Sequence, residues 1–209
     1  MKKIISLTMI LVLLFNVMSF AYAETINYSK DINEIFEQAI TTLNNNSDEI
    51  NYFEPGINTF NFTTTNNRKC SVEVKIEKIP SVNLLSDDTI IYEVEDGSYI
   101  NTTTIKFDPL LGGEMVLKFY YDVSSNVTKL TATDTEEHAS APIGYSLDST
   151  DSWITKASGV GIGGTISAKG TYTIKLFGSW GVPITKNLNV SIKILVPGES
   201  INVWYSQTV

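Results

Sequence analysis

Alternation of apolar and polar residues is the sequence feature that most constrains the fold of this chain. It is clearest within residues 184–195, where Leu188, Val190, Ile192 and Ile194 are separated by polar side chains. Successive side chains of a β-strand point to opposite faces of the sheet, so this period of two predicts a strand with one buried and one solvated face. The same alternation recurs over residues 70–76 and 115–123.

Short strands separated by turn-forming residues account for most of the chain. We expect about nine to eleven of them, which predicts a mainly β chain folded as an antiparallel β-sandwich or a barrel-like fold. The pair Asp96-Gly97 predicts a two-residue type I′ turn between strands at residues 90–95 and 98–107. Residues 134–152 are polar and lack a period, so a loop or a crossing between sheets is expected there.

One helix is expected near the N-terminus, within residues 24–50. Asp31 is placed to cap it, and Glu34 follows three residues later, as in a capping box. The helix presents one broad apolar stripe, which predicts packing on the β-domain of residues 51–209 rather than a mobile arm. A division of that domain near residues 139–152 is the alternative to one continuous sandwich. The stripe consists of Ile32, Ile35, Phe36, Ala39, Ile40 and Leu43.

Residues 1–23 have the three parts of a secretory signal peptide. Lys2 and Lys3 form a positive start, an apolar run follows, and Ala21-Tyr22-Ala23 supplies the small residues that signal peptidase accepts. The run is short for a membrane-spanning helix and has polar interruptions. The sequence therefore predicts cleavage after Ala23 and a secreted, extracellular protein without a permanent membrane anchor.

The net charge limits the classes of partner that we expect, and the cysteine content indicates the kind of organism that makes the protein. The chain has a formal net charge of −8, and loss of the two signal lysines makes it more negative. Nucleic acids and anionic membranes reward clustered Lys and Arg, so we expect no nucleic-acid partner. The single cysteine, Cys70, excludes an internal disulfide. With the short lysine-led signal this favours a bacterial protein, and the position of Cys70 in an apolar row predicts a buried, unreactive thiol.

The densest polar cluster is a candidate metal site. Asp134, Glu136, Glu137 and His138 could together bind a divalent ion, and Ca²⁺ is plentiful outside cells. The acids do not match the spacing of an EF-hand loop, and zinc would require more than one His or Cys. A solvated acidic loop is the simpler interpretation, and we expect no cofactor. His138 is the sole histidine, which excludes any mechanism that requires two.

A glycine-rich segment at residues 159–164 contains the literal pattern G-x-G-x-x-G. In dinucleotide-binding folds these glycines precede a helix whose N-terminus holds a pyrophosphate. Here the following residues, 165–172, have strand-like composition, and no acid follows about 20 residues on. We therefore interpret the segment as a hairpin or a bulged edge.

Exposed aromatic side chains are the candidate ligand-binding residues. Trp180 lies in a predicted turn at residues 178–183, where a large ring is readily presented outward, and Trp153 and Tyr120 could extend the same surface. Tyr and Trp also fill the cores of β-sandwiches, which is the competing interpretation. Enzyme signatures are missing from the sequence. We therefore expect a non-enzymatic binding module, at the cell envelope or in the medium, with cell-wall glycan or a protein as partner.

Two other classes of function stay open from sequence. A glycan hydrolase needs a pair of carboxylates and no histidine, and Glu93, Glu95, Asp108 and Glu114 are candidates. A membrane-active toxin would insert an amphipathic β-hairpin, and residues 160–177 have the low charge and alternation of such a segment.

Three stretches of the sequence resemble those of a known class of proteins: residues 119–130, residues 171–176 leading to 186–193, and residues 60–76. In their order of strands and turns they resemble small secreted β-proteins of Gram-positive bacteria that are classed as domains of unknown function. The likeness covers most of residues 57–195. It implies a secreted β-domain and carries over no functional residues.

Overall fold

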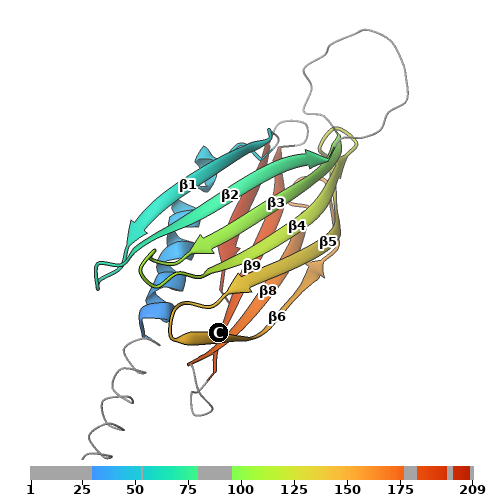
Figure 1. Ribbon diagram of the computed structural model, residues 1–209. Helices are drawn as coiled ribbons and strands as arrows, with labels where there is room; N and C mark the ends of the chain where they lie inside the picture. Colours follow the sequence, from blue (N-terminus) through green and yellow to red (C-terminus); the bar gives the residue numbers. More distant parts are fainter. Residues whose placement is uncertain (1–29, 53, 80–95, 177–182, 197–199, 208–209) are drawn as a thin grey trace, which may run out of the picture.

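Regular alternation of inward and outward side chains builds the larger of two antiparallel sheets. The computed structural model describes residues 30–52, 54–79, 96–176, 183–196 and 200–207, and its larger sheet has the strand order β1-β2-β3-β4-β5-β7 (Figure 1). The inward row of β2 and that of β4 are buried, as their alternation predicted. The strands are β1 (Gly56–Thr63), β2 (Lys69–Ile79), β3 (Gly97–Lys106), β4 (Glu114–Ser124), β5 (Lys129–Ser140) and β7 (Ser158–Val160).

The second sheet has the order β10-β9-β8-β6 and is also antiparallel. Its clearest strand is β9, whose inward residues Leu188, Val190, Ile192 and Ile194 are all fully buried. Figure 1 shows this sheet behind the larger one. Its strands are β6 (Tyr145–Lys156), β8 (Thr165–Leu176), β9 (Ile184–Val196) and β10 (Ser200–Ser206).

The two sheets share one apolar core, which confirms the predicted antiparallel β-sandwich. Val72 and Leu117 of the larger sheet belong to the same buried cluster as Ile166 and Val190 of the smaller one. That cluster includes side chains from both sides of residues 139–152, where a division was considered. Tyr172 also crosses between the sheets, and its hydroxyl donates a hydrogen bond to the backbone oxygen of Val116 at 2.7 Å.

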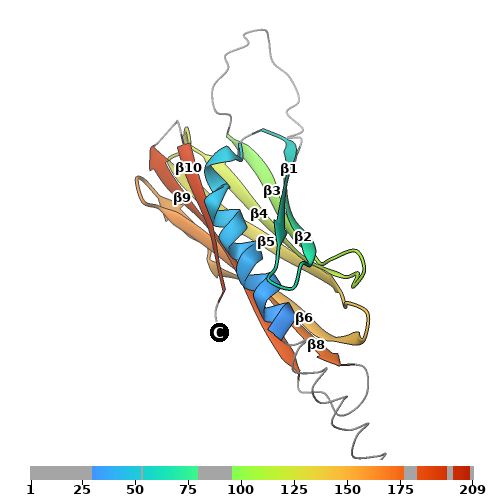
Figure 2. The ribbon, with the colours of Figure 1, turned by 90° about the vertical axis from the view of Figure 1, so that its left-hand side faces the viewer.

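The N-terminal helix, described over residues 30–45, fills the opening between the edges of the two sheets. Figure 2 shows it running between β10 and β1, and its apolar stripe lies in the core, as predicted. At its far end the Asn44 amide holds β10: Nδ2 donates to the Tyr205 oxygen at 2.8 Å, and Oδ1 accepts from the Tyr205 nitrogen at 2.8 Å. A short 3-10 turn, η1 (Ser47–Glu49), then leads toward β1.

The predicted capping box is wrong. Residue 30 is already helical, so Asp31 lies within the helix rather than before it. The two acids instead bind the turn between β1 and β2: Asp31 accepts from Asn66 Nδ2, and Glu34 accepts from the backbone and hydroxyl of Thr65. Both carboxylates therefore fasten the helix to the larger sheet.

Of two further expectations for the strands, one is met only in part and the other is wrong. Residues 134–152 contain the expected crossing between sheets, at residues 141–144, but most of the stretch is strand rather than loop, because β5 of the larger sheet continues to Ser140 and β6 of the smaller sheet begins at Tyr145. Gly97 does not form a type I′ turn: it lacks the positive φ that this turn requires, and it pairs with Val123 as the first residue of β3. The expected strand at residues 90–95 lies outside the described residues.

Candidate functional site

The candidate ligand-binding residues do not lie together. Trp153 is on β6, at the edge of the smaller sheet, and its side chain is on the outer face. Tyr120 is on β4 and belongs to the outer face of the larger sheet, on the opposite side of the sandwich. Trp180 lies outside the described residues. The sequence suggested one surface that includes all three aromatics. Trp153 and Tyr120 lie on opposite sides of the sandwich, so they cannot belong to one surface.

The outer face of the smaller sheet, called here the four-stranded face, carries many short hydroxyl and amide side chains beside Lys169, Lys175 and Lys193. They bond across the strands: Ser167 Oγ and Ser191 Oγ are 3.0 Å apart, and Thr173 Oγ1 and Thr185 Oγ1 are 3.1 Å apart. Thr171 Oγ1 also donates to Asn187 Oδ1 at 2.8 Å. Because these side chains are short and tied to one another, the face is level and polar.

Two tryptophans stand at opposite edges of this face. Trp204 on β10 is 39% exposed, and Trp153 on β6 is 40% exposed. Trp204 lies opposite Ser191, and Trp153 lies opposite Lys169, which places the two rings on adjacent rows of the sheet. Three strand spacings and one two-residue step separate them by roughly 16 Å between backbones.

The surroundings of Trp153 fix its ring. Lys169 Nζ lies 5.2 Å from the ring centroid, within the range of a cation–π contact. The face also carries Lys193 on β9 and Asp151 on β6, and Lys175 Nζ pairs with Asp148 Oδ1 at 2.5 Å near the β6 edge. A held ring with an exposed surface is suited to stacking on a planar or ring-shaped ligand.

The predicted metal cluster does not converge. Its residues alternate along β5, so Glu136 and His138 face outward while Glu137 faces the second sheet. Glu137 accepts from the hydroxyl of Ser152 at 2.5 Å. Among the described residues no group of three or more His, Cys, Asp or Glu side chains is placed to hold a metal ion. Asp134 also lies on the outer side, opposite Tyr120.

Glu136 is instead part of a surface ion pair on the larger sheet. Lys118 Nζ donates to Glu136 Oε2 at 2.8 Å. This bond, with a weaker one from Tyr120, holds the pKa of the Glu136 carboxyl below its usual range, and the same bond raises the pKa of Lys118. Burial raises the pKa of the Tyr120 hydroxyl.

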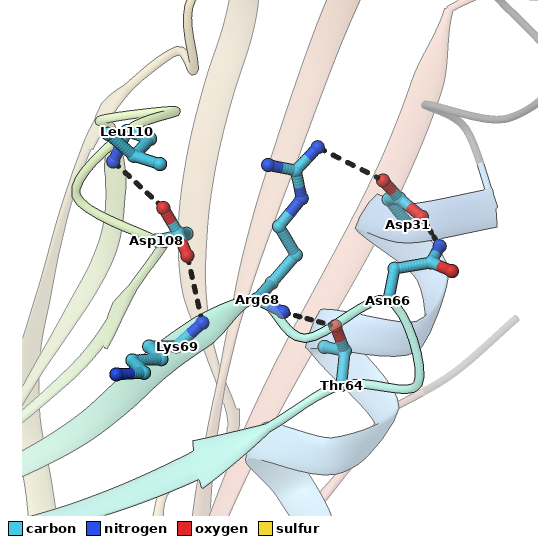
Figure 3. A network of polar contacts seen from close by, with 7 residues as sticks. All are labelled: Asp31, Thr64, Asn66, Arg68, Lys69, Asp108 and Leu110. Carbon is cyan, nitrogen blue, oxygen red and sulfur yellow. Dashed lines mark hydrogen bonds and ion pairs between the residues drawn. The ribbon is translucent and has the colours of Figure 1, made fainter.

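A hollow of about 730 Å³ lies at one end of the larger sheet, between the β1–β2 turn and the segment after β3. Asp108 lies in its wall and is buried. Its carboxylate accepts from the Leu110 nitrogen and from the Lys69 nitrogen, each at 2.8 Å, and these bonds hold the pKa of Asp108 below its usual range (Figure 3). Burial raises the pKa of the neighbouring Cys70 thiol to about 11, so this thiol is not a nucleophile at neutral pH.

The rest of the polar network in Figure 3 joins the helix to the β1–β2 turn. Arg68 Nη2 lies 3.8 Å from Asp31 Oδ2, and the Arg68 nitrogen donates to Thr64 Oγ1 at 3.2 Å. These groups bind one another and the backbone, so the network holds the loops in place, and each Asp108 oxygen accepts from a backbone nitrogen in or next to such a loop. We assign it a structural role.

The glycine-rich segment is a turn between two strands. Residues 161–164 follow β7 and lead directly into β8. Gly159 and Gly164 pack so closely that a Cβ on Gly159 would lie 2.2 Å from the Thr165 nitrogen. The glycines are therefore required by backbone packing. The turn crosses from β7 of the larger sheet to β8 of the smaller sheet, so the expected hairpin is not formed.

The residues of the two alternative functions are placed as follows. Glu93 and Glu95 lie outside the described residues, and Glu114 begins β4 on its outer side, opposite Lys106. Residues 165–176 form β8, which is a central strand between β9 and β6 rather than a free hairpin. In the described part of the chain, no helix is both long enough and apolar enough to span a bilayer.

Comparison with known proteins adds no relative: no family model, no curated protein and no solved structure matches the chain. The resemblance to small secreted β-proteins of Gram-positive bacteria stays a prediction.

The sequence analysis did not predict that Trp153 and Trp204 lie on the same face of one sheet. The signal that could have found the face is the outward row of β9, where Asn187, Asn189 and Ser191 form a run of short polar side chains.

Proposed function

We propose that this protein is an exported, non-enzymatic module that binds an extended glycan on its four-stranded face. The observation that supports the proposal is the pair of exposed tryptophans, Trp153 and Trp204, at the two edges of a level hydroxyl-rich surface. The apolar face of a sugar ring stacks on an indole, and its hydroxyl groups bond to neighbouring Ser, Thr and Asn side chains. Rings roughly 16 Å apart suit a chain of several sugars better than a single one.

A glycan fits this surface better than a protein partner does. The cores of protein interfaces are enriched in aromatic residues but depleted in serine. Between the two tryptophans the face presents Lys169, Ser167, Ser191 and Asn189 rather than a continuous apolar patch. The predicted signal peptide supports a location where cell-wall glycan is accessible.

Co-sedimentation with isolated cell-wall glycan tests the proposal, with lipid vesicles in parallel tubes. The mature chain, residues 24–209, should pellet with glycan and stay in solution with vesicles. Trp153→Ala and Trp204→Ala should each weaken glycan binding about tenfold, which corresponds to about 1.4 kcal/mol. Both side chains lie on the outer face and outside the buried core cluster, so the variants should still fold, which thermal unfolding checks.

Tyr120→Ala is the matched control, because it removes an aromatic ring from the outer face of the other sheet. It should leave glycan binding unchanged. Loss of binding on Tyr120→Ala alone would move the site to the larger sheet. A chain that pellets with vesicles and not with glycan would overturn the proposal in favour of a membrane-active protein, whereas absence of pelleting in both tubes would refute glycan binding.

A further inference from the structure

The edges of the two sheets are not equally protected. At β10, the side chain of Asn44 bonds to both backbone groups of Tyr205. At β6, two register shifts interrupt the strand, and Ser152 and Thr150 bond to Glu137 of β5. Bulges and side chains that occupy an edge are the devices by which natural sheets avoid pairing with another chain.

The far edge of β5 is also occupied. β7 pairs with its first three residues, and the Ala132 nitrogen donates to the Ala157 oxygen at 2.8 Å. β6 lies beside the remainder of β5, where Glu137 accepts its hydroxyl bonds. Three of the four sheet edges therefore meet other parts of the same chain.

β1 is the fourth edge: the N-terminal helix runs beside it (Figure 2), but the strand itself has no register shift, charged residue or proline. All eight of its residues, from Gly56 to Thr63, are uncharged, and none is proline. Its register with β2 runs without interruption, and in the described part of the chain its strand pairing is with β2 alone. Such a strand leaves a row of backbone N–H and C=O groups directed away from its neighbour.

The side chains of β1 also leave apolar surface uncovered. Phe60 and Phe62 face inward and pack against the core, but both are only partly buried. Ile57 points outward and is 61% exposed. A further strand beside β1 would cover the two phenylalanines as β1 itself covers the inward row of β2.

We propose that β1 pairs antiparallel with β1 of a second copy, across a two-fold axis normal to the larger sheet. With this axis, the side chains that face the core in one copy lie on the same side of the joined sheet as those of the other copy. A register centred on Phe60 places its ring next to the second copy's Phe60. Outward, it sets Thr59 opposite the second copy's Asn61. Because every residue of β1 is uncharged, self-pairing places no like charges opposite one another, and one copy supplies the donors and acceptors that the other needs.

The pairing joins two six-stranded sheets into one and leaves both four-stranded faces free on the same side of the dimer. It does not depend on what those faces bind. The negative charge of each copy opposes association, so added salt should strengthen the dimer.

Sedimentation velocity of the mature chain tests the inference across protein concentration and salt. We expect a reversible monomer–dimer equilibrium. Thr59→Lys, at an exposed outward position near the axis, should weaken dimerisation at least tenfold while the circular dichroism spectrum stays unchanged. Thr133→Lys adds the same charge at an exposed position on β5 and should leave dimerisation unchanged. A chain that is monomeric at every concentration, or a dimer that tolerates Thr59→Lys, would overturn the proposal.

A spin-label distance locates the interface directly. Ser71 lies on β2, opposite Asn61 of β1. In the proposed dimer two labels on Ser71→Cys have backbones roughly 16 Å apart, from three strand spacings and a two-residue offset. Cys70 is buried and should not take the label. Labels more than about 30 Å apart would place the interface on another surface and refute the pairing.

Discussion

Asn44 is the residue whose replacement most directly tests how the helix is joined to the smaller sheet. Its amide makes two bonds of 2.8 Å to the backbone of Tyr205, a residue that is 1% exposed. Asn44→Ala removes both partners and leaves a backbone donor and a backbone acceptor unpaired at a partly buried site. A hydrogen bond contributes about 0.5–1.5 kcal/mol net, so we expect a loss of about 2 kcal/mol in the free energy of unfolding.

Urea unfolding followed by circular dichroism measures this loss as a lower midpoint with an unchanged slope. Asn46→Ala is the matched control, since its amide bonds to Thr42 of its own helix at 2.7 Å. Removal of that local bond should cost about 1 kcal/mol or less. If Asn44→Ala is no more destabilising than Asn46→Ala, the two bonds to Tyr205 do not stabilise the fold and the argument fails.

The variant Asn44→Asp allows the two hydrogen bonds to Tyr205 to be tested separately, because the protonation of the new carboxyl depends on pH. An ionised carboxylate still accepts from the Tyr205 nitrogen but cannot donate to the Tyr205 oxygen, and its charge opposes that oxygen. A protonated carboxyl restores the donor, so the folded state should raise the pKa of this aspartate above the ordinary value of about 3.9. The variant should therefore gain stability relative to the parent chain as the pH falls toward 4, and a constant difference would contradict the assignment.

Two further predictions concern the core and the hollow. Gly170→Ala should cost about 1–3 kcal/mol in the free energy of unfolding, because the new Cβ would lie 2.7 Å from the Tyr172 hydroxyl; an unchanged urea midpoint would refute this close contact. Asp108 has a lowered pKa, so its stabilising effect is present above the pKa of the unfolded chain and is lost as the pH falls through its folded value. The parent chain should thus lose stability below about pH 4 more steeply than Asp108→Asn, and parallel pH profiles would contradict this role.

Strands with an apolar inward row were predictable from sequence. Val72, Leu117 and Ile192 are buried in such rows. A strand with one buried face needs an apolar side chain at every second position, and the alternation in the sequence shows this directly. The helix was predictable for the same reason, because its stripe packs in the core. Its first turn was not, since Asp31 and Glu34 bind a turn that is distant in sequence.

The second half of β5 was missed because two of its inward side chains, Thr135 and Glu137, are polar, and Ala139 is its one apolar inward residue. Thr135 and Glu137 face the corner where β5 meets β6, and both interact with the hydroxyl of Ser152. Hydrogen bonds replace apolar packing at this corner, so the sequence shows no period of two in hydrophobicity. Two strands that contact each other through polar side chains have polar sequences, and each sequence considered alone therefore indicates a loop.

The candidate site depends on information that alternation does not contain. The outward direction of Trp153 and of Tyr120 follows from the residues beside them, but the sheet to which each strand belongs does not. Trp153 and Trp204 share a face because long-range pairing gives the order β10-β9-β8-β6. That order brings together strands from distant parts of the chain.

The contrast between the two outer faces is the strongest structural support for a function on the smaller sheet. Neither face packs in the core, so folding places similar demands on both. The larger sheet carries spaced ion pairs, such as Lys106 with Glu73 at 2.7 Å and Lys118 with Glu136 at 2.8 Å, as is typical of a solvated surface. The four-stranded face has an ion pair near the β6 edge, Lys175 with Asp148 at 2.5 Å, but between Trp153 and Trp204 it carries bonded hydroxyl groups. Solubility alone would favour charges over exposed indole rings there, and we infer that ligand binding accounts for the difference.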